Sequence, residues 1–284
     1  QRAFFKKFDS PHILQMSATP IPRSLALAFF GEFEVSVIDE MPAWRKPITT
    51  KIISEAEFKK MKTWILNKIS QWEQIYLITP LVEDSEKMDE LSSAVTEFEQ
   101  ISGFLPELKW QIWLLHWRLK SSDKDDIMND FKNWKLKFLV STTVIEVWID
   151  VPQATIIIIK NSERFGLSQL HQLRWRVWRS DLQSYCFLIT KSKSWDTYQR
   201  LKAMEDTNDW FKLAQIDMQL RGSWEILWTR QSWETDLPVE ILTDIKLIEK
   251  VKDSALRLLE KYPELKGLDR LKAKVLGNDY EVLI

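Results

Sequence analysis

Near its middle the chain carries a cluster of arginines that could bind a phosphate. Arg174, Arg176 and Arg179 follow Gln172 within FGLSQLHQLRWRVWR, residues 165–179, a run without an acidic residue. Guanidinium groups are planar and permanently charged, and they donate paired hydrogen bonds to phosphate oxygens. The cluster therefore predicts a phosphate site. A helix whose arginines pair with acids on a neighbouring element is the alternative, and the surrounding motifs must decide between the two.

The elements that would position this cluster alternate along the chain. Several short runs are continuously apolar or β-branched, which is typical of strands buried on both faces of a parallel sheet. We expect strands at residues 13–19, 75–80, 111–116, 137–143, 154–161 and 184–190, helices at 85–101 and 121–133, and a helical region beyond about residue 190. Ser122 and Asp125 have the spacing of a capping box at the start of the second helix. The pattern predicts an α/β fold, a parallel sheet with flanking helices.

Polar residues end several of these strands. In open parallel sheets, ligands bind outside the carboxyl ends of the strands. The residues expected at this rim are Thr19, Thr79, His116, Ser141, Thr142 and Thr143. A lone histidine at a strand end is more often a residue whose hydrogen bonds are satisfied within the fold, and a strand end rich in serine and threonine is more often a turn. These positions therefore indicate a site only when they are taken together.

Composition restricts the class of protein. The 284 residues carry 40 basic and 41 acidic side chains, so net charge gives no support to a nucleic-acid partner, and any such surface must be local. Cys186 is the only cysteine, which excludes an internal disulfide and fits a cytoplasmic protein. No apolar run approaches the roughly 20 residues of a membrane span. No metal-ligand spacing and no Ser-His-Asp arrangement stands out.

Three motifs together resemble those of superfamily 2 helicases. Residues 172–179 resemble the sixth helicase motif, Gln-x-x-Gly-Arg-x-Gly-Arg, with tryptophan at both glycine positions, Trp175 and Trp178. STTVIEVWIDVP, residues 141–152, resembles motif V, and Ser17-Ala18-Thr19 resembles motif III. The longer run SATPIPRSLALAFFGEFEVSVIDEMP is similar to the RecG family, bacterial ATP-dependent translocases that remodel branched DNA. The resemblance implies a RecA-like sheet and favours the phosphate interpretation of the arginines.

The family's roles transfer to matching positions. The resemblance implies that Arg176 binds the γ-phosphate, that Arg179 is the arginine finger, and that Gln172 contacts the nucleotide or the attacking water. It places Asp150 beside the nucleotide. It also assigns contacts with DNA and a role in coupling hydrolysis to movement. The implied DNA contacts are His116, Arg118, Ser141 and Thr142, and the implied coupling residues are Ser17, Thr19, Arg221 and Gln231.

The resemblance also implies a domain plan. Residues 1–40 would end a first RecA-like domain, 41–192, after a proline-bearing linker at 41–50, would form the second, and 193–284 would form a helical region that contains the family's TRG motif. ATP and Mg²⁺ would be held mainly by a first domain that carries the Walker A and DExH motifs, so this segment alone should be inactive. The expected whole is a monomeric helicase that migrates stalled forks and Holliday junctions. The alternatives are a transcription-repair coupling factor and a non-catalytic nucleic-acid-binding module.

Tryptophan and glycine are present in abnormal numbers. The chain has 15 tryptophans and 6 glycines, and glycine is about 2% of the chain against a usual value of about 7%. Twelve tryptophans occupy family glycine positions, namely Trp44, Trp72, Trp113, Trp117, Trp134, Trp148, Trp175, Trp178, Trp210, Trp224, Trp228 and Trp233. Our hypothesis is that UGA codons read as glycine in the source organism were rendered as tryptophan. Stacking of the tryptophans on single-stranded bases is the alternative.

Overall fold

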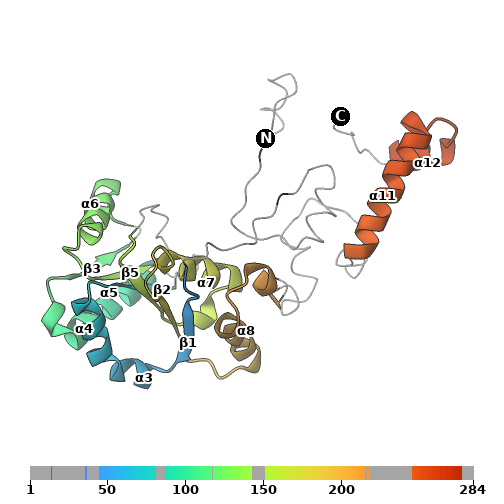
Figure 1. Cartoon of the computed structure of the whole chain (residues 1–284). Helices are drawn as coiled ribbons and strands as arrows, with labels where there is room; N and C mark the ends of the chain where they lie inside the picture. Colours follow the sequence, from blue (N-terminus) through green and yellow to red (C-terminus); the bar gives the residue numbers. More distant parts are fainter. Residues whose placement is uncertain are drawn as a thin grey trace. The chain divides into compact units, whose positions relative to one another are not determined.

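The computed structural model describes residues 14, 36, 45–80, 87–116, 118–142, 151–214, 216–217 and 245–276. Contacts between residues divide the chain into two compact units. Residues 1–20 and 40–220 form the first, and residues 21–39 and 221–284 form the second. The first unit contains a sheet covered by helices, and the second contains the helices near the carboxyl terminus (Figure 1).

The first unit is built on a six-stranded sheet of order β1-β6-β5-β2-β4-β3, in which every pair of neighbouring strands is parallel. The strands are β1 (Thr49–Ile53), β2 (Gln74–Thr79), β3 (Ile112–Leu115), β4 (Phe138–Thr142), β5 (Ala154–Ile159) and β6 (Tyr185–Ile189). All residues of β2, β4 and β5 are buried. The predicted α/β fold with a parallel sheet is therefore confirmed.

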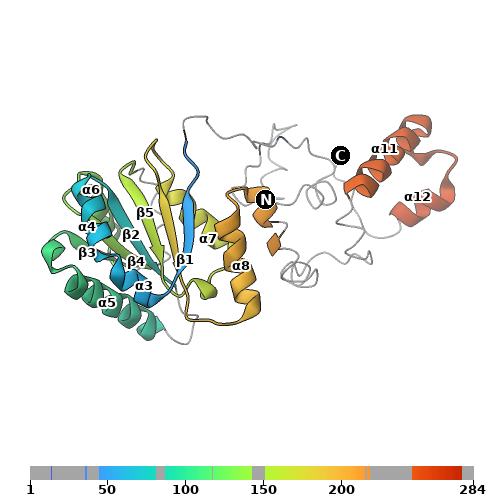
Figure 2. The ribbon, with the colours of Figure 1, turned by 60° about the horizontal axis from the view of Figure 1, so that its bottom comes forward.

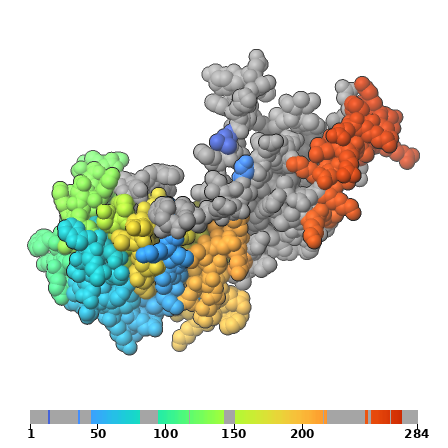
Figure 3. Space-filling model, in the orientation of Figure 1, coloured from blue at the N-terminus to red at the C-terminus, as the bar shows by residue number. Residues whose placement is uncertain are grey.

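Helices cover both faces of the sheet (Figure 2). Along β2, Tyr76 and Ile78 join the hydrophobic cluster under α6, α7 and α8, while Ile75 and Leu77 join the cluster under α3, α4 and α5. This alternation is the two-residue period of a strand. The helices are α3 (Glu55–Lys60), α4 (Lys62–Ser70), α5 (Lys87–Phe104), α6 (Ser121–Lys132), α7 (Leu167–Arg174) and α8 (Trp195–Asp206). In Figure 3, the blue atoms of the β1 segment lie beside the orange atoms of α8, which packs on that strand.

Two local predictions differ from the structure. The proline-bearing stretch 41–50 was expected to be a linker, but its last two residues, Thr49 and Thr50, already pair with β6. The capping box expected at α6 is also wrong. The helix begins at Ser121, its N-cap Lys120 makes no side-chain capping bond, and the Ser122 hydroxyl donates to Asp123 instead. Strand β1 thus starts two residues before the expected end of the linker, whereas α6 starts at the predicted residue and lacks only the expected cap.

The described part of the second unit is helical, as predicted. It contains α11 (Ile245–Lys261), a short 3-10 helix, η4 (Pro263–Leu265), and α12 (Asp269–Leu276). Gly267 between them has φ 86°, a left-handed conformation that suits glycine. In the described part of the chain, no helix is long and apolar enough to cross a membrane.

Candidate nucleotide and DNA interface

The carboxyl ends of all six strands lie at one edge of the sheet, because every strand runs in the same direction. Four of the polar residues predicted for this rim meet there. Thr142 is in register with Thr79 on β2, and Ser141 with Leu115 on β3, immediately before His116. The pairs on neighbouring strand ends are 63 positions apart, for Thr79 and Thr142, and 26 positions apart, for Leu115 and Ser141. The other two predicted rim residues, Thr19 and Thr143, lie outside the described residues.

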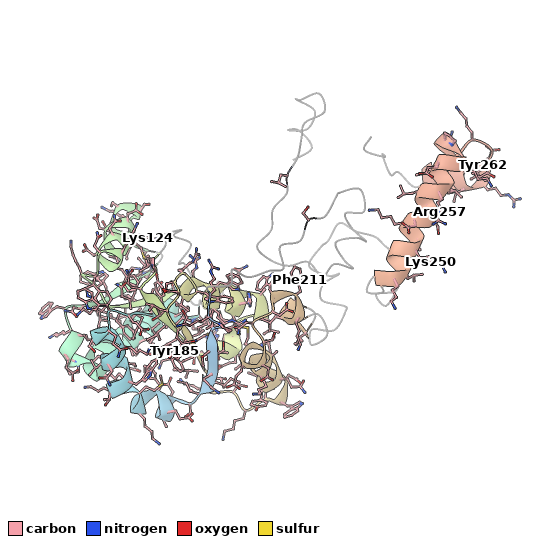
Figure 4. All side chains as sticks on the ribbon, in the orientation of Figure 1. Lys124, Tyr185, Phe211, Lys250, Arg257 and Tyr262 are labelled. Atoms are coloured by element: carbon pink, nitrogen blue, oxygen red, sulfur yellow. The ribbon has the colours of Figure 1, made fainter. Side chains whose placement is uncertain are left out.

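Two polar atoms at this rim are buried without a hydrogen-bond partner among the described residues, His116 Nδ1 and Thr142 Oγ1. The Ser141 hydroxyl, by contrast, donates to the Thr142 carbonyl at 2.8 Å. Partial burial lowers the pKa of His116, and the positive charges of Arg118 and Lys124 lower it further. Lys124 lies on α6 (Figure 4). The rim thus offers an anion two unsatisfied polar atoms beside two cationic side chains.

Arg174 lies at the carboxyl end of α7, and its guanidinium group is hydrogen-bonded inside the protein. Its Nη1 donates to the carbonyls of Met204 at 2.6 Å and Thr207 at 3.0 Å, and to the Thr50 hydroxyl at 3.2 Å. Its Nη2 lies 2.9 Å from His171 Nδ1. Burial lowers the pKa of Arg174 to about 10, so it remains charged at neutral pH. Arg174 therefore joins α7 to β1 and to the end of α8 and is not available to a phosphate, a correction to the three-arginine prediction.

The next two arginines lie beyond the end of the helix. The chain leaves α7 in a 3-10 turn, η3 (Trp175–Val177), in which Arg176 is half-buried, and Arg179 after it is exposed. Gln172, on α7, is exposed as well, whereas the Gln169 side chain accepts a bond from the Gly166 N–H at the start of the helix. Gln172 and Arg179 are therefore accessible from solvent, and Arg176 partly so, as a nucleotide site requires.

Five predicted site residues, Ser17, Thr19, Asp150, Arg221 and Gln231, lie outside the described residues. Among the residues that are described, no group of acids, histidines and cysteines could hold a metal ion.

A buried charge that is not among the predicted site residues lies at the same rim. Lys160, directly after β5, is 3% exposed, and its Nζ lies 2.7 Å from Glu55 and 3.3 Å from Glu97. The signal was a lysine that ends the run ATIIIIK, because a lysine placed after a fully buried strand needs acidic partners. Lys160 thereby ties β5 to α3 and α5 beneath the rim.

Comparison with known proteins identifies this sheet. Residues 58–181, which include β2 to β5 and the arginine cluster, match the family "Helicase conserved C-terminal domain". The chain is 45% identical over 256 residues to the ATP-dependent DNA helicase RecG of Streptococcus pneumoniae serotype 4, and the match covers 90% of this chain and 38% of that protein. The chain carries a RecG-type helicase C-terminal domain. The predicted resemblance is confirmed.

Two further RecG proteins support this assignment. RecG of Synechocystis sp. is 44% identical over 287 residues, which cover 100% of this chain and 34% of that protein. The solved structure "Structure of RecG bound to three-way DNA junction" matches with a TM-score of 0.64 and 39% identity, over 82% of this chain and 30% of that one. The chain thus spans little more than a third of the length of its RecG relatives. These matches favour RecG over a transcription-repair coupling factor or a non-catalytic module.

Proposed function

We propose that this chain is the carboxyl-terminal motor half of an ATP-dependent RecG helicase that acts on forked and four-way DNA during repair and recombination. The observation that carries the proposal is the geometry after α7. One arginine of the cluster is locked inside the fold, while Arg176 and Arg179 follow the end of the helix at positions that solvent reaches. The name and bound DNA of the RecG structure support branched DNA as the substrate class.

Arg176, Arg179 and Gln172 are the proposed nucleotide-facing residues. Arg176 would hold the γ-phosphate, Arg179 would stabilise the charge that develops as the terminal bond breaks, and Gln172 would orient the attacking water. Guanidinium groups that solvent can reach fit a phosphate chain that arrives from outside this domain. Asp150 would lie beside the nucleotide. ATP and Mg²⁺ would be held mainly by a first RecA-like domain, and Mg²⁺ would neutralise phosphate charge there.

We place the DNA contacts at the rim formed by β3 and β4. Thr142 and His116 would each offer a buried, unpartnered polar atom to a backbone phosphate, and Arg118 would add an exposed charge. Ser141 would assist through its backbone, since its hydroxyl already donates within the strand. A phosphate bound beside His116 would raise the lowered pKa of this imidazole, because a nearby negative charge favours the protonated form.

The remaining roles rest on the resemblance alone. Ser17, Thr19, Arg221 and Gln231 would couple hydrolysis to DNA movement. Residues 1–40 would complete the first motor domain, 41–192 would form the second, and 193–284 would form the TRG region. The whole protein would work as a monomer in the cytoplasm.

The test is ATP hydrolysis by the full-length protein with and without a forked duplex. We expect hydrolysis that the fork stimulates, and loss of that stimulation when His116 and Thr142 are both replaced by alanine. A protein that binds forks but never hydrolyses ATP would support the non-catalytic module instead. Stimulation by RNA polymerase rather than by forks would support the coupling factor.

A further inference from the structure

Two tryptophans of the sheet unit have a backbone conformation that suits glycine. Trp72 has φ 67° and Trp134 has φ 64°. In this left-handed region the Cβ atom approaches the backbone closely, so residues other than glycine, asparagine and aspartate rarely occupy it. Asn161, with φ 47°, belongs to the tolerant types. Leu265 has φ 57°, so a positive φ alone does not identify a glycine position. The hydrogen bonds around each tryptophan are therefore needed as well.

Trp72 is the first residue beyond the C-cap of α4. The Glu73 N–H donates to the Lys68 carbonyl at 3.2 Å, and the Trp72 N–H donates to the Ile69 carbonyl at 3.1 Å. These two bonds together form the Schellman motif, which closes a helix through one left-handed residue, most often glycine.

Trp134 repeats this arrangement at the end of α6. The Lys135 N–H donates to the Asp130 carbonyl at 2.9 Å, and the Trp134 N–H donates to the Phe131 carbonyl at 3.1 Å. Two helices of one domain thus end in the same glycine motif with a tryptophan in the glycine position.

Neither indole packs in the hydrophobic core. Trp72 is 66% exposed, and its ring stacks on that of Trp134 with centroids 5.1 Å apart. Trp64, on α4, is different. Its ring packs edge-on against Tyr185 at 5.2 Å and Phe187 at 5.5 Å, beside the hydrophobic cluster under α3, α4 and α5. Tyr185 is labelled in Figure 4. Trp64 thus has the contacts expected of a real tryptophan.

Trp175 presents a separate conflict of hydrogen-bond donors. A neutral imidazole has one acceptor nitrogen. Two N–H groups point at the ring of His171, Arg174 Nη2 toward Nδ1 and Trp175 Nε1 toward Nε2. One of them therefore lacks an acceptor, and a glycine at position 175 would remove the surplus donor. Trp178 raises no such demand, since its indole donates to the Lys46 carbonyl at 2.6 Å.

We propose that positions 72, 134 and 175 are glycine in the working protein, decoded from UGA by a glycine-charged transfer RNA, and that Trp64 is a true tryptophan. The inference stands on backbone angles and hydrogen bonds, and it does not depend on the proposed helicase activity.

Peptide mass spectrometry of the protein purified from its source cells tests the proposal directly. We expect glycine at positions 72, 134 and 175 and tryptophan at position 64 in the same sample. Tryptophan at position 72, 134 or 175 overturns the proposal.

Folding equilibria of the recombinant chain give a second, independent test. Starting from W72G/W134G, which removes both misfit rings, restoring either tryptophan should lower the folding equilibrium constant about tenfold. The matched control W64G should lower it by about a hundredfold or more, because it deletes packed aromatic contacts. Restored tryptophans that leave stability unchanged or higher would contradict the proposal.

Discussion

Arg174 and Arg179 carry the same side chain five residues apart, yet the fold uses them in opposite ways. Arg174 is 1% exposed and donates to two carbonyls and a hydroxyl from other elements, whereas Arg179 lies on the surface after the helix has ended. The difference follows from where α7 stops. Arg174 lies in the last turn of α7 and contacts β1 and the end of α8, whereas Arg179 follows the 3-10 turn η3 and its side chain is exposed.

The end of β4 repeats the contrast on a smaller scale. The Ser141 hydroxyl donates to a carbonyl of its own strand, and the next hydroxyl, on Thr142, is buried without a partner among the described residues. In the first place the fold binds Arg174 while Arg179 stays exposed, and in the second it binds the Ser141 hydroxyl while the Thr142 hydroxyl has no partner among the described residues. A cluster of suitable residue types therefore overstates the size of a site.

The largest effect expected is on catalysis. Arg179→Ala in the full-length protein should lower the kcat of ATP hydrolysis by about 10³-fold, because the proposed finger would stabilise charge that develops only in the transition state. Stability should not change, since the side chain is exposed. The measurement is steady-state hydrolysis at saturating forked DNA. Arg164→Ala, which removes another exposed arginine, is the matched control and should leave kcat unchanged.

Substitution of Arg174 should instead lower the stability of the fold. Arg174→Met should lower the free energy of unfolding by about 3 kcal/mol, because three acceptors lose a charged donor inside the protein. Arg174→Lys should restore little of this loss, since one ammonium cannot reproduce the guanidinium geometry. Denaturant titration measures both. A stable Arg174→Met protein with kcat lowered as in Arg179→Ala would reverse the assignment of the two arginines.

The sequence predicted five of the six strands, β2 to β6, but not the role of Arg174, for physical reasons. The strand expected at 13–19 lies outside the described residues except for residue 14. Runs such as IYLIT and ATIIII contain only apolar, aromatic or β-branched residues, and a central parallel strand buries such a run on both faces. The partners of Arg174 lie 124, 30 and 33 positions away, on β1 and at the end of α8. No local pattern contains that information.

Short elements near prolines also could not be predicted from the sequence. Strand β1, TTKII, is only half apolar and follows Pro47, so its composition resembles that of a linker. Pairing with β6 decides its structure. The motif positions were predictable because a resemblance supplied them, but which hydroxyl of Ser141 and Thr142 is already bonded required coordinates.

A smaller effect on the free energy of unfolding is expected when the pH is lowered. Burial, with the charge of Arg174, lowers the pKa of His171 to about 2. Below pH 6.5 the His171 side chain therefore binds a proton in the unfolded state but not in the folded state. The free energy of unfolding is unaffected by this group above pH 6.5 and decreases as the pH falls below that value. The free energy of unfolding should decline by up to about 1.4 kcal/mol per pH unit through this group. His171→Asn should remove that part of the slope between pH 6 and 4. An unchanged slope would show that other groups cause it.

The smallest effect concerns Thr142. Thr142→Val keeps the shape and removes a buried, unpartnered hydroxyl, so the free energy of unfolding should rise by about 1 kcal/mol. Binding of forked DNA at fixed salt should weaken by about 1 kcal/mol if the hydroxyl meets a phosphate. Ser141→Ala is the matched variant, and it should affect stability more than DNA binding, because its hydroxyl is already bonded within the strand.

The central claim is that the arginine beyond α7 acts on the transition state while the arginine within it holds the fold. The most direct measurement compares the affinity of full-length Arg179→Ala for a non-hydrolysable ATP analogue with its affinity for ADP and fluoroaluminate, which mimics the transferring phosphoryl group. We predict that affinity for the mimic falls by about 10³-fold and that affinity for the ATP analogue changes little. Equal losses for both ligands, or no loss for either, would contradict the account.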